Sequence, residues 1–474
     1  MSKQQATKTK TYLFVGISIP LLLIILVYFL NKTYNYSSIV HSEPAVKPIE
    51  PEPHQVLVCP ENEKDKPNNN CNYFGGNGLA KAINDADKNI DTIIKLKPSE
   101  YTRLENSETF TDNEGINQKC FLYSKDKNIK LVGLESDDHT KPIINGRGMD
   151  NPMSGICIDG GHFEISNIIL KDFLRSTTFC TKEDVDCSEG SGIAILSYNS
   201  EITIKSVILG TGNFSAMKSD NSNLAISDSD IAENSDGISL YNGSIKVSGS
   251  RFYNNRFSAG YYVNSDVVFQ NNIFFENGPK GGMNLYNSNK TPNYTIINNT
   301  FYKNTYANLN IEIGYGSDSP FMKITNNIFT DAQVYFGSLG SWGEGIHLED
   351  YDNYLAKKPE NFDIGFNLFW KNGNTPEKYC ANNYLLCNMK GSIIGKDPLF
   401  NNPNEKDFRL KTGSPAINAG ANGLTIGAIE QTVDTTSEDK KPAIPNDQPV
   451  PETDTPVEAS SPTETPSPDS TYNP

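Results

Sequence analysis

Five short segments of the sequence, spaced roughly 22 residues apart, carry the side chains best suited to chemistry. Their sequences are GIAILS at 192, SAMKSD at 215, DGISLY at 236, AGYYVN at 259 and GGMNLY at 281. If each segment is a strand, alternation turns one set of side chains inward and the other outward. The inward set is Ile193, Met217, Ile238 and Met283. The outward set is Ala194, Lys218, Ser239, Tyr261 and Asn284, with a second outward row of Asp220, Tyr241, Val263 and Tyr286.

The outward side chains combine a candidate base with groups that bind sugars and cations. Lys218 can remove a proton if its surroundings lower the pKa of its amine. Asp220 and Asp236 are hard oxygen donors of the kind that bind Ca²⁺. Tyrosines suit sugar rings and arginines suit carboxylates, so the candidate substrate-binding residues are Tyr241, Tyr261, Tyr286, Asn284, Arg251 and Arg256. The alternative is that Lys218 and the aspartates merely solvate the surface.

Two further candidates lie earlier in the chain. Arg147, in NGRGMD, and His162, in GGHFEI, are the next candidate catalytic residues if Lys218 is not the base. A lone histidine without a partner is more often structural, which weakens His162. Asp228 and Asp230 fall on a different strand from Lys218, so no carboxylate cluster is evident, and no GxSxG, HExxH or P-loop occurs.

A repeat explains the spacing of these segments. The pattern recurs as ISDSDI at 226, VSGSRF at 247, FQNNIF at 269, IINNTF at 296, ITNNIF at 324 and IGFNLF at 364. A period near 22 with strand-like residues and no helical stripe predicts an all-β solenoid in which each repeat forms one coil. Like residues then stack in columns. One column is Ser229, Ser250, Asn272, Asn299, Asn327 and Asn367, a second is Asn234, Asn255, Asn277, Asn304 and Asn372, and the interior stack is Ile231, Phe252, Phe274, Phe301, Phe329 and Phe369.

Two segments at the ends of the repeat region carry a resemblance to a known family. Residues 79–102 resemble the helical cap and first strand, and residues 397–430 resemble the C-terminal coil, of the right-handed parallel β-helix family of pectate lyases, alginate lyases and mannuronan epimerases. The resemblance covers about 75–430 and implies a single-stranded right-handed parallel β-helix with its site on the outer face of one sheet.

The reaction implied by this resemblance acts on an acidic polysaccharide. We expect β-elimination or C5 epimerisation of a uronic acid, with Lys218 as base and an arginine or Ca²⁺ neutralising the carboxylate. The family also contains proteins that are not enzymes. The alternative is therefore a surface module that binds glycans or proteins without catalysis.

The chain ends indicate an extracytoplasmic location. Residues 12–30 form an uncharged apolar run, preceded by the lysine-containing segment 1–11, and predict a single-pass membrane anchor. A cleaved signal peptide and secretion are the alternative. Residues 31–57 read as an extended linker, 58–431 as the folded domain and 432–474 as a disordered acidic tail. The net charge of −16 argues against nucleic acid as a partner.

Eight cysteines and an export signal predict disulfide bonds. Proximity in sequence favours Cys59–Cys71, Cys120–Cys157, Cys180–Cys187 and Cys380–Cys387, although other pairings remain open. Zinc binding is the alternative, and the absence of CxxC pairs weakens it.

Overall fold

The computed structural model describes residues 52–67, 70–103, 108–111, 117–147, 154–173, 192–337, 340–373 and 390–428. The predicted membrane anchor at 12–30, the tail at 432–474 and the cysteines at 180, 187, 380 and 387 lie outside these residues. Within the described residues, no helix has both the length and the apolar character needed to cross a membrane. The membrane anchor, the tail and these two cysteine pairs therefore stay predictions.

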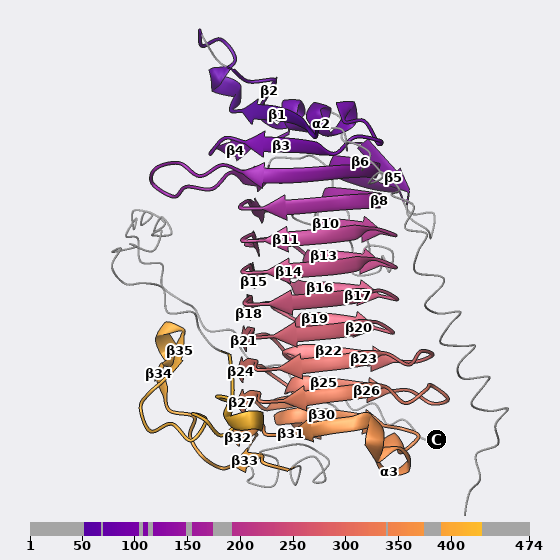
Figure 1. Cartoon of the computed structure of the whole chain (residues 1–474), viewed down its shortest axis with the longest axis vertical. Coiled ribbons are helices and arrows are strands. Elements are labelled where there is room, and N and C mark those ends of the chain that lie inside the picture. Colours follow the sequence, from indigo (N-terminus) through magenta and orange to yellow (C-terminus); the bar gives the residue numbers. More distant parts are fainter. Residues whose placement is uncertain are drawn as a thin grey trace, which may run out of the picture.

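The described residues form a right-handed parallel β-helix, as predicted, with coils stacked along one long axis (Figure 1). Each coil contributes one strand to each of three parallel ladders. The first ladder contains β10 (Ile193–Tyr198), β13 (Ser215–Asp220), β16 (Asp236–Tyr241), β19 (Ser258–Val263), β22 (Met283–Asn287), β25 (Ala307–Ile313) and β30 (Glu344–Asp350). The second contains β11 (Glu201–Lys205), β14 (Asn223–Ser227), β17 (Ser244–Ser248), β20 (Asp266–Gln270), β23 (Asn293–Ile297), β26 (Phe321–Thr325) and β31 (Phe362–Gly365).

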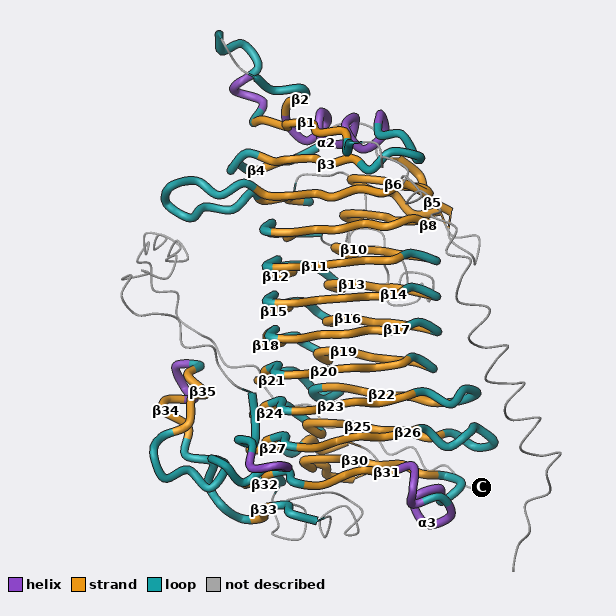
Figure 2. Tube along the Cα trace, viewed as in Figure 1, coloured by secondary structure: helices purple, strands orange, loops and turns teal. Residues whose placement is uncertain are grey.

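The third ladder is built from shorter strands at the opposite wall of the solenoid. It contains β4 (Glu100–Tyr101), β7 (Ile143–Asn145), β9 (Ile169–Lys171), β12 (Ile208–Gly210), β15 (Asp230–Ala232), β18 (Arg251–Tyr253), β21 (Ile273–Phe275), β24 (Thr300–Tyr302), β27 (Ile328–Thr330), β32 (Leu368–Trp370) and β33 (Ile393–Ile394). Two long strands, β6 (Asn117–Gly133) and β8 (Ser154–Ser166), run through the first and second ladders without a break. Short loops turn the corners of the coils (Figure 2).

The predicted polar columns are present and buried. Asn299 illustrates the pattern: its Oδ1 accepts from the backbone N of Asn272 at 2.9 Å, and its Nδ2 donates to Oδ1 of Asn327 at 3.1 Å. The second column forms the same chain of bonds, for example from Asn255 to Asn277 at 2.9 Å. These bonds satisfy backbone groups that the corner of each coil removes from the strand ladders.

The left-handed backbone conformation at this corner belongs to the residue before each column residue, which the sequence did not reveal. Asn271, Asn298 and Asn326 have φ angles of 57°, 56° and 59°. Asparagine tolerates this region better than most residues. The NN pairs of the repeat therefore divide two tasks, since the first residue turns the chain and the second bonds to the next coil.

The interior aromatic stack also follows the predicted order. The rings of Phe252, Phe274, Phe301, Phe329 and Phe369 stack with centroids 4.6–5.3 Å apart. All five side chains are fully buried in the main core. Stacked coils bring equivalent residues together at the spacing between strands, which explains this regular contact.

The N-terminal end of the solenoid is capped by a helix, as the resemblance implied. Helix α2 (Gly75–Asp85) packs Leu79 and Ile83 into the core. Strand β1 (His54–Cys59) pairs with β3 (Thr92–Leu96) and with β2 (Tyr73–Phe74). The ordered structure thus begins at least four residues before the predicted domain start at 58, inside the segment that we assigned to a linker.

The C-terminal segment corrects one prediction. Residues 397–428 do not add a further coil, because β34 (Phe400–Asn402) and β35 (Asp407–Leu410) pair antiparallel with each other. Phe400 and Phe408 instead pack on the outer side of the third ladder, against residues such as Tyr302. The segment that resembles a C-terminal coil therefore covers an outer face of the third ladder.

Smaller elements complete the described chain. They are η1 (Glu61–Glu63), β5 (Glu108–Thr111), β28 (Tyr335–Gly337), β29 (Gly340–Trp342), α3 (Tyr354–Lys357), η3 (Pro359–Asn361), η5 (Pro403–Glu405) and η6 (Ala421–Gly423). Strands β28 and β29 form an antiparallel hairpin in the loop that leads into β30. Helix α3 follows shortly after β30, which is the last strand of the first ladder.

Candidate functional site

The outer face of the first ladder carries two parallel rows of polar and aromatic side chains. The row that comes first along each strand, which we call the inner row, contains Lys218, Ser239, Tyr261, Asn284, Asn310 and His347 in successive coils. The outer row runs Asp220, Tyr241, Val263, Tyr286, Glu312 and Glu349. The predicted register is therefore present from β13 to β22, and the rows continue over two further coils.

The prediction was wrong for the coil before Lys218. Leu196 is the register partner of Lys218, and Ile195 is the partner of Met217. Ala194 is buried in the main core rather than on the outer face. Ile193 belongs instead to an apolar cluster with Cys120, Cys157, Leu196 and Tyr198. The assumed alignment was thus two residues out of step at this strand.

The predicted residues around Lys218 do lie near one another. Lys218 and Tyr261 are two coils apart in the inner row, and the rings of Tyr241 and Tyr261 meet edge to face at 6.3 Å. Asp220 accepts a hydrogen bond of 3.2 Å from Nδ2 of Asn242. A catalytic role for Lys218 stays a prediction.

The two predicted calcium ligands are far apart. Asp220 is the register partner of Tyr241 at the end of β16, whereas Asp236 begins that strand. Five residues of extended chain span roughly 17 Å. The two carboxylates therefore cannot hold one ion, and calcium binding at either of them alone stays a prediction. Burial raises the pKa of Asp236, while Lys280 and Ser258 oppose that rise.

The predicted arginine clamps also lie away from Lys218. Arg251 is on the third ladder, where its guanidinium forms two hydrogen bonds of 2.8 and 2.7 Å with the carboxylate of Asp230. Arg256 lies in the following loop, with its guanidinium 5.5 Å from the ring centre of Phe257. A carboxylate bound beside Lys218 on the first ladder would not meet Arg251.

The remaining candidates occupy other walls of the solenoid. Arg147 follows β7 of the third ladder, and its Nε lies 3.9 Å from Oδ2 of Asp172. His162 lies in the part of β8 that pairs with β11 of the second ladder, with its Nδ1 3.6 Å from Oε2 of Glu201. Lys218, Arg147 and His162 thus lie on three different ladders and do not form one site.

A cluster that the sequence analysis missed lies at the far end of the two rows. His347 is buried, with only 4% of its surface exposed, between two glutamates of its own strand β30. Its Nε2 lies 3.2 Å from Oε1 of Glu349, and its Nδ1 lies 3.5 Å from Oε2 of Glu344. The ring of Tyr306 covers the imidazole at a centroid distance of 5.3 Å. We call Glu312, Glu344, His347, Glu349 and Tyr306 the histidine cluster.

The carboxylates favour the charged form of the imidazole. Burial lowers the pKa of His347, but the attraction from Glu344 and Glu349 and the hydrogen bond with Glu349 outweigh burial, so the pKa lies above its ordinary value. Burial raises the pKa of Tyr306 to about 12, and the charges of Glu349, Glu344 and Glu312 add to that rise. At neutral pH, Tyr306 therefore keeps its proton.

The pKa values of two glutamates of the cluster are shifted in opposite directions. Glu312 and Glu349 are register partners on β25 and β30. Burial and the charge of Glu349 raise the pKa of Glu312. Burial also acts to raise the pKa of Glu349, but hydrogen bonds from Tyr351 and His347 and the imidazolium charge bring it below its ordinary value. The surroundings thus move the pKa of one carboxyl group up and that of its neighbour down.

Aromatic side chains flank the cluster on the exposed side. Tyr351 is 43% exposed and Tyr315 is 76% exposed, and their rings lie 4.8 Å apart. Along the inner row, Nδ2 of Asn310 donates to Oδ1 of Asn284 at 3.2 Å, and Tyr261 follows with 37% of its surface exposed. Exposed rings next to acid–base groups suit a sugar chain lying along the solenoid.

The sequence contained a signal for this cluster that the repeat spacing obscured. NLNIEI at 308 and GIHLED at 345 continue the series that ends with GGMNLY at 281. A longer loop, including β28 and β29, separates these two strands. The repeat at 324 and 364 marks the coils that carry Glu312 and His347, but the outward rows were followed only as far as GGMNLY.

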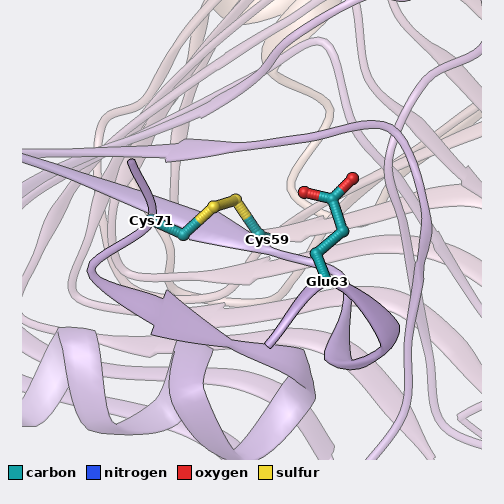
Figure 3. Close-up of side chains that lie close together, drawn as sticks. All are labelled: Cys59, Glu63 and Cys71. Carbon is teal, nitrogen blue, oxygen red and sulfur yellow. A yellow bond between two sulfur atoms is a disulfide. The ribbon is translucent and has the colours of Figure 1, made fainter. Parts of the chain in front are cut away.

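Two other features do not coincide with the cluster. A groove of about 530 Å³ lies at the corner between the first and second ladders and is lined by polar residues that include Asn242, Asp266 and Lys290. At the N-terminal end, Cys59, Cys71 and Glu63 lie close together (Figure 3). The two sulfurs are bonded to each other, and Glu63 pairs with Lys97 at 2.8 Å, so this group is occupied by structural contacts.

The disulfides Cys59–Cys71 and Cys120–Cys157 are both present, as predicted. The first ties the strand β1 to the residues before β2. The second joins the long strands β6 and β8 within the apolar cluster of the first ladder. Both therefore stabilise the N-terminal coils.

Comparisons with known proteins confirm the predicted β-helix resemblance. A family model described as right handed beta helix region matches residues 105–301. The A-module of the mannuronan C-5 epimerase AlgE4 from Azotobacter vinelandii is 13% identical over 64% of this chain and 88% of its own, with a TM-score of 0.30. The periplasmic alginate epimerase AlgG is 13% identical over 72% of this chain and 75% of its own, with a TM-score of 0.23. No curated protein matches the sequence, and we draw no conclusion about activity from these similarities.

Proposed function

We propose that this protein is a carbohydrate-active enzyme that hydrolyses a glycosidic bond at the histidine cluster, with Glu312 as general acid and Glu349 as nucleophile or general base. The observation that supports this proposal is the pairing of Glu312 and Glu349 on adjacent strands in unlike surroundings. Two carboxyl groups on one face, one protonated and one ionised, are what glycoside hydrolysis requires.

The chemical roles follow from the contacts of each carboxyl group. Glu312 gives its proton to the glycosidic oxygen, and the bond between that oxygen and the anomeric carbon breaks. Glu349 either attacks the anomeric carbon or removes a proton from the attacking water. One water is consumed, and its proton finally restores the acid form of Glu312. Both products leave as sugars, one of them with a new reducing end.

His347 acts through Glu349 in this proposal. Its Nε2 and the Tyr351 hydroxyl both bind the Glu349 carboxylate, which keeps that group ionised and in a fixed orientation. Glu344 holds the other side of the imidazole. His347 and Glu344 are therefore positioning residues, and the exposed rings of Tyr351 and Tyr261 supply surfaces for neighbouring sugars.

The lyase or epimerase reaction predicted from the sequence is a second candidate at the same place. It is favoured by the contact between His347 and Tyr306, since an imidazole and a phenol can act as a base and a proton donor. The charge of the imidazole argues against this use, because a base must be unprotonated before it accepts a proton. The hydrolytic assignment does not have this difficulty.

The identity of the products separates these possibilities. Hydrolysis releases reducing ends without ultraviolet absorbance, elimination releases an unsaturated uronate that absorbs, and epimerisation changes the sugar without cleaving the chain. We expect reducing ends from the wild-type protein, loss of this activity in Glu349→Gln, and full activity in Lys218→Ala. Glycan binding without turnover would support the non-catalytic surface module instead.

A further inference from the structure

We infer that the sugar unit bound at the histidine cluster carries no carboxylate, so that the substrate is a neutral glycan rather than a polyuronate. This inference rests on the proposed function for the location of the site. It departs from the acidic polysaccharide that the sequence predicts. The evidence for the inference is the charge of the described residues in and around the cluster.

The cluster contains three glutamates and one imidazole. Glu312, Glu344 and Glu349 form no ion pair with a lysine or arginine of the described chain, and their described ion pairs involve His347 alone. The charged groups that perturb Glu312 are Glu349 and His347, and both of these belong to the cluster. Even with His347 charged, the three glutamates leave the cluster with a net negative charge in either protonation state of Glu312, and this charge repels a substrate carboxylate.

Burial strengthens that repulsion, because it reduces the screening of the charges by water and salt. Glu344 is 2% exposed and His347 is 4% exposed. Oε2 of Glu344 and Nδ1 of His347 face each other at 3.5 Å, and neither atom has a hydrogen-bond partner in the described structure. Charges in such a place are weakly screened by water and salt. The cation that a uronate requires is already held between two glutamates, so it is not available to a second carboxylate.

The part of the inner row that leads to the cluster also offers no cation to a substrate carboxylate. Between Lys218 and His347 the inner row contains Ser239, Tyr261, Asn284 and Asn310, which are all uncharged. Five strand spacings of about 4.8 Å put the lysine roughly 24 Å from the histidine. Hydroxyl, phenol and amide groups bind sugar hydroxyls and acetamido groups, and they do not neutralise charge.

A pair of polymers that differ only in charge tests this inference. Polygalacturonate and its methyl ester share one backbone, and neutral xylan, β-glucan and soluble chitin oligomers widen the neutral set. We would measure binding and release of reducing ends with the full chain. The expected result is binding, with turnover, of at least one neutral glycan, and binding of the methyl ester at least about tenfold tighter than binding of polygalacturonate.

A cation added to the row provides a matched control. N310R places a guanidinium one strand from His347, and S239R places the same group in the same row four strands away. We expect N310R to narrow the preference for the methyl ester by about tenfold and S239R to leave it unchanged. An equal effect of both variants would show that general surface charge, rather than the cluster, sets the preference, and would overturn the inference.

The two proposals fail in distinguishable ways. Cleavage of polygalacturonate in preference to every neutral glycan, abolished by E349Q, would overturn this inference and leave the proposed hydrolysis intact. Selective binding of a neutral glycan without turnover would sustain this inference and overturn the proposed reaction. Binding to no polymer of the panel would overturn both.

Discussion

Glu312 and Glu349 lie side by side on neighbouring strands of the first ladder, yet only Glu349 receives hydrogen bonds from His347 and Tyr351. The shared position follows from the parallel register, which puts equivalent residues of successive coils at the strand spacing. The unlike surroundings follow from sequence, since β30 carries the histidine and is followed directly by the tyrosine. A repetitive scaffold thus produces two chemically different carboxyl groups.

The first prediction concerns this pair. Replacing either Glu312 or Glu349 by glutamine should lower kcat by roughly 10²–10⁴-fold, the range for loss of a general acid or base. The substitution keeps side-chain size, so both variants should fold, although Glu349→Gln removes one partner of the His347 charge. Glu233→Gln alters an exposed carboxylate at a corner of the third ladder and serves as the control. Retention of full activity in Glu349→Gln would place the chemistry elsewhere.

The second prediction is the pH dependence of kcat/KM. The reaction needs Glu349 ionised and Glu312 protonated. The rate therefore falls at low pH, through the lowered pKa of Glu349, and falls again as pH rises through the raised pKa of Glu312. We expect a bell-shaped profile centred in the acidic range.

The variant His347→Asn tests which groups cause the falls in rate at low and at high pH, the two limbs of the profile. His347 faces Glu344 and Glu349 from its own strand, and Glu312 and Tyr306 from β25 and the loop before it. Its charge lowers the pKa of both Glu312 and Glu349, so its loss should move both limbs of the profile to higher pH. Reduced activity with unmoved limbs would assign His347 a merely structural role.

The third prediction concerns stability and pH. The pKa of His347 is raised above its ordinary value of 6.5 in the folded protein. A raised pKa stabilises the fold fully below the unfolded value, and this contribution is lost as pH rises through the folded value. The difference in melting temperature between wild type and His347→Asn should therefore be larger at pH 5 than at pH 9. A difference independent of pH would mean that the imidazole is neutral.

The sequence predicts the scaffold better than the site because the scaffold repeats. The asparagine columns and the phenylalanine stack recur with nearly constant spacing, and each copy supports the assignment of the others. The outward rows from Lys218 to Tyr286 follow from the same spacing by strand alternation. In contrast, the residues of the histidine cluster occur once each, on coils whose spacing is lengthened by loops.

Single residues were misplaced where local packing overrides the period. Ala194 lies level with Ala216 at the start of the strand, where both side chains are buried in the main core, so strict alternation does not hold at this end of β10. Arg251 follows the repeat faithfully, but its partner Asp230 one coil away binds its guanidinium on the third ladder. In a solenoid, the partner of a charged residue can lie on the neighbouring coil. The repeat spacing in the sequence alone does not say which ladder the two residues occupy.

The fourth prediction concerns the polar columns. In Asn299→Ala, the buried backbone N of Asn272 loses its acceptor, and Nδ2 of that residue keeps only its bond to the backbone O of Val247. Each buried polar group left without a partner costs about 1–3 kcal/mol. We therefore expect roughly 3 kcal/mol of destabilisation in chemical denaturation. Asn293→Ala, at an exposed position of β23, should cost less than about 0.5 kcal/mol.

The fifth prediction concerns the aromatic stack. Phe274 is fully buried between Phe252 and Phe301, with ring centroids 4.7 and 4.6 Å away. Phe274→Ala leaves a cavity inside the solenoid, and we expect a loss of about 3–5 kcal/mol in the free energy of unfolding. Phe321, also a strand phenylalanine but 50% exposed, is the matched control, and its replacement by alanine should cost less than about 1 kcal/mol. Equal costs for the two variants would contradict the placement of this stack in the core, because only a buried ring leaves a cavity when it is removed.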